Sequence, residues 1–247
     1  MASSLKNIIK LFSQTRSVFG IRVLGTENVE KERFNHAANV LRQYLDNNQD
    51  GKPDSKKLLR KLKRNKAAMT LFENEDELDD FLESHGHKID NAKFNFQDLY
   101  NDEIILASDN TTQFDATLEE VFHLISDYGY AQINPKTFGN SKDSIIGQLM
   151  TEARGGHFRT TPSKYPKKAY YTYNDKTCNY ECQITEYLYW GVTSMLGGQN
   201  GPGRYNDIKE EWRLNTPEKI KSHAPELYNL LSDPKLGLPT ILPDGIL

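Results

Sequence analysis

Two residues that can bind a metal ion, Glu119 and His123, lie four positions apart in the segment 117–125. Apolar residues recur at helical spacing in this segment, and residues at i and i+4 share one face of a helix. A carboxylate and an imidazole on one face can therefore bind the same ion. A hydrolytic metal site needs about three protein ligands, an open position for water and a base that activates this water. The pair predicts a metal site, with its third ligand elsewhere in the chain.

Glu186 is the candidate for that third ligand. It lies in Thr-Glu-Tyr-Leu-Tyr-Trp, residues 185–190, within a strongly apolar segment that predicts a buried helix. A carboxylate is costly to bury there unless it meets a cation or a hydrogen-bond donor. His157 and Glu152 are the alternative source of ligands if Glu119 is not used.

These motifs resemble those of the zincin metallopeptidases whose third ligand is a glutamate. The resemblance covers residues 100–200 and rests on the E-x-x-x-H helix and on the later helix that begins with Glu-Tyr-Leu. It implies a mixed sheet packed on the metal-bearing helix. It also implies that Glu119, His123 and Glu186 are metal ligands and that Glu120 is the general base.

The resemblance further implies a tyrosine that donates a hydrogen bond to an oxyanion. Tyr170, Tyr171 and Tyr173 lie just upstream of the Glu186 helix, and Tyr173 is the residue we select. The substrate implied is a peptide or protein.

The first ligand departs from the family, because Glu119 stands where the H-E-x-x-H motif has its first histidine. Two carboxylates and one imidazole make the metal a poorer Lewis acid and shift the preference toward harder ions. The expected cofactor is a divalent transition metal, zinc or manganese/iron. Residues 118–123 and the loop at 46–54 also resemble a group of microbial and marine proteins, which implies no activity.

Other interpretations of the 117–125 segment stay open. Glu120 and His123 form one E-x-x-H motif, whereas carboxylate-bridged di-iron sites need two. An oxygen-ligated iron or manganese protein with redox chemistry is a further alternative. An ordinary amphipathic helix is the simplest one, because acidic residues near a helix start are favoured by the helix dipole.

A calcium-type loop is predicted at residues 46–54. Its oxygen-bearing side chains alternate and precede Gly51, as a calcium loop requires; they are Asp46, Asn48, Asp50 and Asp54. The bidentate acid of an EF-hand is missing, and the pattern is closer to the loops of extracellular calcium repeats. The expected ion is structural and joins two helices. A polar turn between two helices is the alternative, because Asp, Asn and Gly also form turns.

The composition narrows the function classes. The chain has 247 residues, 13 Tyr, 11 Phe and a net charge of −3, which predicts a folded protein that does not bind nucleic acid. The basic run at 56–64 predicts the solvated face of an amphipathic helix. No apolar run reaches the roughly 18–20 residues that a membrane span needs. The oligomeric state is left open.

Two cysteines, Cys178 and Cys182, bear on the compartment. Their spacing suggests a small disulfide loop in a secreted protein or a free thiol pair in a cytosolic one. A glycosylation sequon at 110–112 fits secretion. We expect a secreted or extracellular protein, with a disulfide between the two. A non-catalytic, calcium-stabilised extracellular binding or structural protein, with a degenerate zincin-like helix, is the alternative to a hydrolase.

The predicted fold is α+β, a predominantly helical zincin-like domain with a small mixed sheet. We predict one domain, 1–247, with an N-terminal part at 17–100, the metal-site helices at 101–200 and a Pro-rich wrapping tail at 201–247. The sequence pattern predicts strands at 17–25, 67–72 and 104–107, and helices at 34–45, from 117 to about 129, at 144–153 and at 183–196.

Overall fold

The computed structural model describes residues 2–247, with side chains from residue 5 onward. The fold is α+β, mostly helical with a small mixed sheet. The chain forms two compact units, one comprising Met1–Gly129 with Pro243–Leu247 and the other Tyr130–Leu242. Among the described residues, no helix is both long and apolar enough to cross a membrane.

The sheet of the first unit has four strands in chain order: β1 (Gln14–Val18), β2 (Ile21–Gly25), β3 (Ala67–Phe72) and β4 (Asn95–Tyr100). β1 and β2 are antiparallel, whereas β2, β3 and β4 are parallel. The segment predicted as one strand at 17–25 forms a hairpin, because Phe19 and Gly20 have φ angles of 49° and 91° that reverse the chain. The strand predicted at 67–72 coincides with β3.

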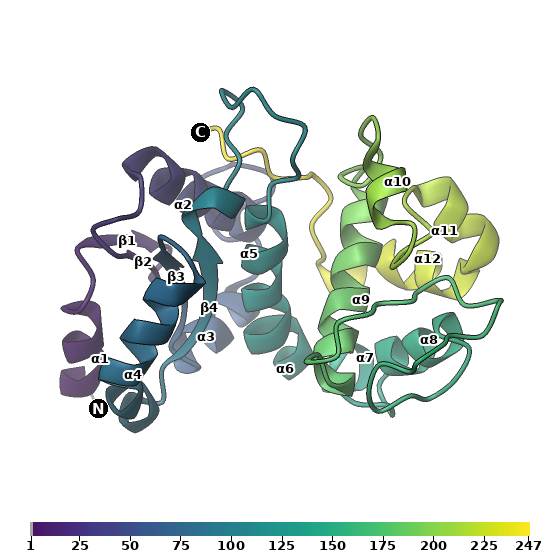
Figure 1. Ribbon diagram of the computed structural model, residues 1–247, viewed down its shortest axis with the longest axis horizontal. Helices are drawn as coiled ribbons and strands as arrows, with labels where there is room; N and C mark the ends of the chain where they lie inside the picture. The colour runs from purple at the N-terminus through teal and green to yellow at the C-terminus, as the bar shows by residue number, and fades with distance from the viewer. Residues whose placement is uncertain (1) are drawn as a thin grey trace. The chain divides into compact units, whose positions relative to one another are not determined.

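Helices cover both faces of this sheet (Figure 1). They are α1 (Ala2–Ile9), α2 (Lys31–Leu45), α3 (Lys56–Arg64), α4 (Glu75–Ala92) and α5 (Thr117–Ile125). Successive side chains of a strand point to opposite faces. Leu24 and Phe72 therefore pack with α1 and α4 on one face, while Gln97 of β4 reaches α5 on the other.

A strand at 104–107 was predicted from its apolar residues, and this prediction is wrong. A short 3-10 helix, η1 (Asn101–Glu103), ends β4, and residues 104–116 form a loop. Ile104 is buried there without pairing in the sheet, because burial of an apolar side chain does not by itself require a strand.

The second unit is helical. A π-helical turn, η2 (Ser126–Tyr130), follows α5 directly. The α-helices of the second unit are α6 (Ala131–Ile133), α7 (Pro135–Phe138), α8 (Ile145–Ala153), α9 (Tyr180–Met195), α10 (Arg204–Ile208), α11 (Pro217–His223) and α12 (Pro225–Leu231). A 3-10 helix, η3 (Pro234–Leu236), comes after them. α9 packs against α8, α11 and α12 (Figure 1). Most of its length is buried, which accounts for its apolar sequence.

The segment predicted as a wrapping tail, 201–247, contains α10, α11 and α12. Pro217 and Pro225 each begin a helix, where a proline is tolerated because the first N–H has no helical partner. Residues 243–247 pack on the first unit.

Candidate metal centre

The start of α5 is held by side chains of the first unit. The Asp115 carboxylate accepts a hydrogen bond from the Thr117 N–H at 3.1 Å and lies 2.7 Å from His36 Nε2. The Tyr44 hydroxyl donates to the carbonyl of Leu118 at 3.0 Å. These contacts fix the first turn of the helix, in which the acidic residues lie.

α5 brings three potential metal ligands together. One ligand atom from each of Glu119, Glu120 and His123 lies within 4.8 Å of the other two. His123 is buried, with 6% of its surface exposed, and both glutamates are half-buried. Among the residues that the structure describes, no other group of three or more acidic, histidine or cysteine side chains is gathered in this way.

Gln97 orients the second carboxylate of this group. Its Nε2 donates to Glu120 Oε2 at 2.6 Å, and the same oxygen lies 3.5 Å from His123 Nδ1. The adjacent strand thus holds Glu120 beside the imidazole. Two protein ligands at about 2.1 Å from one zinc-sized ion can lie no more than about 4.2 Å apart. The ligand atoms of the three side chains lie within 4.8 Å of one another, so small side-chain rotations are enough to bring them to one ion.

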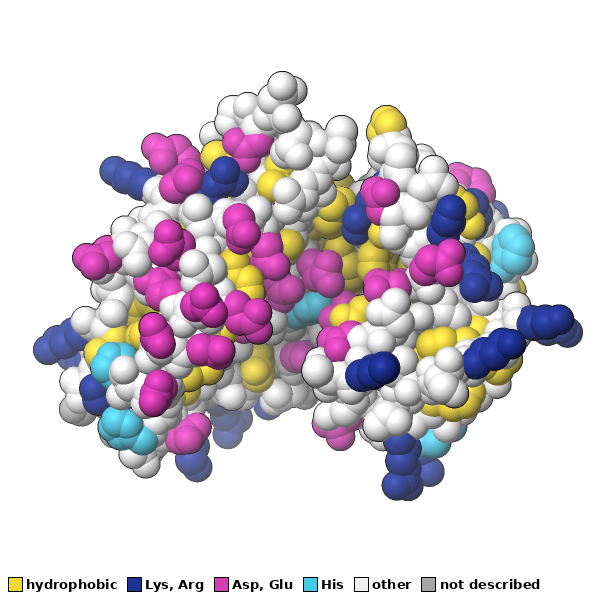
Figure 2. Space-filling model, in the orientation of Figure 1, with side chains coloured by type: hydrophobic (Ala, Val, Ile, Leu, Met, Phe, Trp, Pro, Cys, Tyr) yellow, Lys and Arg dark blue, Asp and Glu magenta, His cyan; other side chains and the backbone are white. Residues whose placement is uncertain are grey.

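The surroundings of the cluster are acidic. Acidic side chains gather on the face of the first unit shown in Figure 2, over α4, β4 and α5. Burial raises the pKa of Glu103, and the negative charges of Glu120, Asp102 and Asp98 add to this effect. Like charges destabilise one another in a partly buried place, so a divalent cation here would relieve the repulsion. The donor set and the local charge both fit a metal ion.

Glu186 and Tyr173 belong to the second unit, whereas the three-ligand cluster consists of residues of the first. Glu186 lies on α9 with only 7% of its surface exposed. Burial raises the pKa of Glu211, which lies in the same unit, and the negative charge of Glu186 raises it further. The role of Glu186 as a ligand stays a prediction.

The three tyrosines named above differ in what their hydroxyl groups contact. The Tyr171 hydroxyl is buried and donates to the Gln183 carbonyl at 2.9 Å, and that of Tyr170 lies 3.4 Å from the Tyr187 hydroxyl. Tyr173 is half-buried. The structure therefore commits Tyr171 to the core, and the role of Tyr173 stays a prediction.

His157 and Glu152 are not part of a metal-ligand group among the described residues. The His157 ring packs on Tyr180, while Glu152 lines a separate cavity with Tyr170 and Glu226.

The predicted calcium loop is a network of turns. Asp46 is 1% exposed, and its two oxygens accept hydrogen bonds from the Asp50 and Gly51 N–H groups, each at 3.0 Å. Asn48 also accepts from the Asp50 N–H, and Asp54 accepts from the Asn47 N–H at 2.7 Å. The carboxylates of this loop do not form a three-ligand group.

Cys178 and Cys182 form a disulfide, with their Cα atoms 5.4 Å apart. It spans the start of α9, where the Asn179 side chain accepts a hydrogen bond from the Cys182 N–H. A disulfide fits an oxidising, extracellular compartment.

The chain was compared with protein-family models, with curated proteins and with solved structures, and no match was found in any of the three comparisons. Spacing along the chain indicated Glu119 and His123, but it gave no sign of Gln97 or Asp115. Gln97 lies on a strand 23 residues before Glu120, and only the pairing of β3 with β4 places it beside α5.

Proposed function

We propose that this protein is a metal-dependent hydrolase whose metal ion is bound by Glu119 and His123. The observation that carries the proposal is the convergence of two carboxylates and a buried imidazole on one helix. A carboxylate oxygen and an imidazole nitrogen as protein ligands suit zinc, manganese or iron.

Glu120 is the proposed general base. Gln97 and His123 both face its Oε2, so Oε1 is the oxygen that can take a proton from water. A bound divalent ion would supply Lewis-acid activation of that water, lowering its pKa toward about 7. Gln97 would keep Glu120 in position when the carboxylate becomes protonated.

Peptide bonds are the proposed substrate, by resemblance to the zincins. The features that support this are a mixed sheet packed on the helix that bears the ligands and a downstream helix, α9, that bears the buried Glu186. Export of the protein is part of the same proposal, and the disulfide at the start of α9 supports it.

Replacing Glu120 by Gln tests the proposed base. The amide keeps the size of the side chain and an acceptor for Gln97, but it cannot take a proton at neutral pH. We expect hydrolysis of a mixed peptide library to fall by at least about a hundredfold, with the metal content unchanged. Glu83→Gln, which removes an exposed charge on α4, is the matched control. Unchanged turnover in Glu120→Gln would exclude the role of base, and loss of metal would make Glu120 a ligand instead.

A second candidate function is a non-catalytic, calcium-stabilised extracellular protein. The observation that favours it is the buried Asp46 carboxylate at the centre of the 46–54 loop. Asp50→Asn removes one charge and retains the Oδ1 acceptor for the Lys52 N–H. If the loop binds calcium, adding calcium chloride raises the melting temperature of the original protein more than that of Asp50→Asn. Equal shifts would exclude the calcium site.

A further inference from the structure

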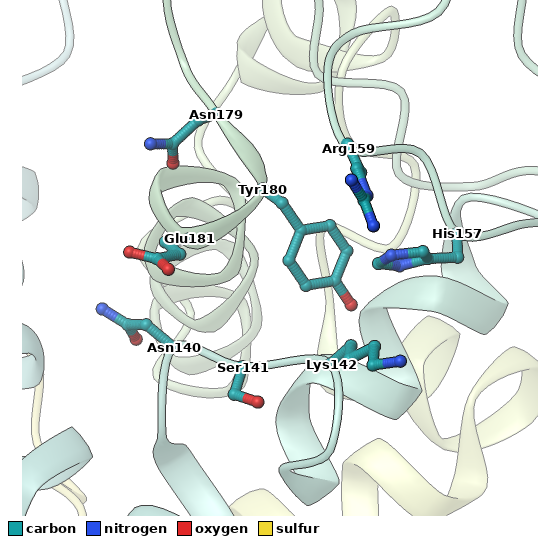
Figure 3. Close-up of a pocket in the computed structure, with 8 residues that line it drawn as sticks. All are labelled: Asn140, Ser141, Lys142, His157, Arg159, Asn179, Tyr180 and Glu181. Carbon is teal, nitrogen blue, oxygen red and sulfur yellow. The ribbon is translucent and has the colours of Figure 1, made fainter.

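A pocket of about 520 Å³ lies within the second unit, and none of Glu119, Glu120 and His123 lines it. Three segments form it: the loop before α8, the loop after α8 and the first turn of α9 (Figure 3). Pockets that bind small molecules have volumes of about 300–1,000 Å³. This pocket is therefore large enough for a ligand the size of a sugar derivative.

The back of the pocket is held in place by Tyr180. Its hydroxyl group contacts the Gly147 carbonyl at 3.0 Å and the Thr151 hydroxyl at 2.9 Å, both on α8. The His157 ring packs edge-on against the Tyr180 ring, with the centroids 4.6 Å apart. The disulfide between Cys178 and Cys182 closes the same turn of α9. The pocket is thus preformed.

Two cationic side chains, Lys142 and Arg159, line the pocket. Both are exposed, and neither forms a hydrogen bond or ion pair through its side chain with another described residue. In Figure 3 they lie on the same side of the Tyr180 ring as His157, whereas Glu181 lies on the opposite side. One half of the pocket is therefore positively charged and not neutralised by an acidic residue.

The uncharged lining residues offer further hydrogen bonds. Asn140 and Asn179 bring amide groups, and Ser141 brings a hydroxyl group. They lie away from the Arg159 side in Figure 3. A ligand that fits both halves carries a negative group at one end and hydroxyl or amide groups along its body.

We propose that this pocket binds a small organic anion, a carboxylate or phosphate on a polar, sugar-sized body, with Lys142 and Arg159 contacting the negative group. Charge-assisted hydrogen bonds are the stronger ones, and the planar guanidinium of Arg159 can bind either oxyanion through two parallel bonds. The proposal does not depend on a metal ion at α5.

Isothermal titration calorimetry of the full chain with glucuronate, glucose 6-phosphate and glucose tests the proposal. The three probes share a ring and differ in their negative group. We expect at least one of the two anions to bind with a dissociation constant below about 1 mM, and glucose to bind at least about tenfold more weakly. Whichever anion binds more tightly identifies the negative group that the pocket favours.

Variants separate the pocket from general charge attraction. Arg159→Gln and Lys142→Gln should each weaken binding of the preferred anion at least about fivefold, while Lys235→Gln, an exposed cation of the same unit outside the pocket, should leave it unchanged. Near-ultraviolet circular dichroism checks that each variant is folded.

His123→Ala should bind the anion like the original protein, which separates this test from that of the hydrolase. The proposal is overturned if neither anion binds at millimolar concentration, if glucose binds equally well, or if the pocket variants behave like Lys235→Gln.

Discussion

Arg154 shows how a single charged residue organises part of the second unit. It has no exposed surface, yet it forms no ion pair with a described acidic residue. Its guanidinium lies over the rings of Phe158 and Tyr165, at 5.3 and 5.5 Å from their centroids. It also donates to the Phe158 carbonyl at 2.8 Å. Aromatic faces and a carbonyl thus take the place of a carboxylate around this buried cation.

Replacing Arg154 by Ala should lower the free energy of unfolding by about 3 kcal/mol, because it leaves the half-buried Phe158 carbonyl without its donor and removes the packing against both rings. Urea denaturation measures this loss. Arg159→Gln, which changes an exposed cation in the same loop, should change stability by less than about 0.5 kcal/mol. Equal stability of the two variants would contradict the structural role of Arg154.

At the scale of elements, α8 is joined to the loop before it through a close backbone contact. Gly147 lies in the first turn of α8, and a Cβ atom there would come within 2.1 Å of the Ser141 carbonyl oxygen. The Ser144 side chain caps the same turn by accepting a hydrogen bond from the Gly147 N–H. The loop can pack this closely only because residue 147 has no side chain. Gly86, in the middle of α4, has no neighbour within 4 Å of such an atom.

Two glycine substitutions in helices should therefore have opposite effects. Gly147→Ala should lower the free energy of unfolding by about 1–3 kcal/mol, because the Ser141 backbone must move. Gly86→Ala should raise it by about 0.5–1 kcal/mol, because alanine has the higher helix propensity and enough space. Thermal unfolding of both variants measures this contrast, and a stabilising Gly147→Ala would contradict the packing described here.

At the scale of the whole molecule, the chain ends by returning to the unit in which it began. Gln43 of α2 donates to Asp244 Oδ1 at 2.6 Å and to the Ile246 carbonyl at 2.9 Å. The Gln43 side-chain oxygen accepts the N–H groups of Asp244 and Gly245. One amide side chain thus binds the last residues to the first unit.

This attachment should depend on pH. The hydrogen bond from Gln43 and that from the Ile246 N–H lower the pKa of Asp244. A carboxyl group whose pKa is lower in the folded protein than in the unfolded chain stabilises the fold at pH values above the unfolded-chain pKa of about 3.9. This stabilisation is lost as the pH falls through the pKa of the folded protein. Asp244→Asn should cost about 0.5 kcal/mol at pH 7, a small amount because the residue is exposed. The difference from the original protein should disappear well below pH 4. A pH-independent difference in urea denaturation would contradict this explanation.

Much of the secondary structure could be predicted from local patterns. The strand at 67–72 and the helices at 34–45, 144–153 and 183–196 agree with β3, α2, α8 and α9 to within three residues, because each has a long apolar pattern. β4 could not be predicted in this way, since Asn95, Gln97 and Asp98 make it polar and only half-buried.

The candidate site likewise has a part that local sequence patterns predict and a part that depends on tertiary structure. Helical spacing was enough to indicate Glu119 and His123. The contacts from Gln97 and Asp115 depend on tertiary structure, because residues distant in sequence or outside the helix complete the site.

The central claim is that α5 holds a metal ion, and elemental mass spectrometry of protein purified without added metals or chelators tests it most directly. We predict about one equivalent of zinc, manganese or iron per chain, a content typical of a mononuclear site. Glu119→Ala and His123→Ala should lose this metal, while Glu83→Gln should retain it. A chain that contains no transition metal, or variants that keep it in full, would contradict the account.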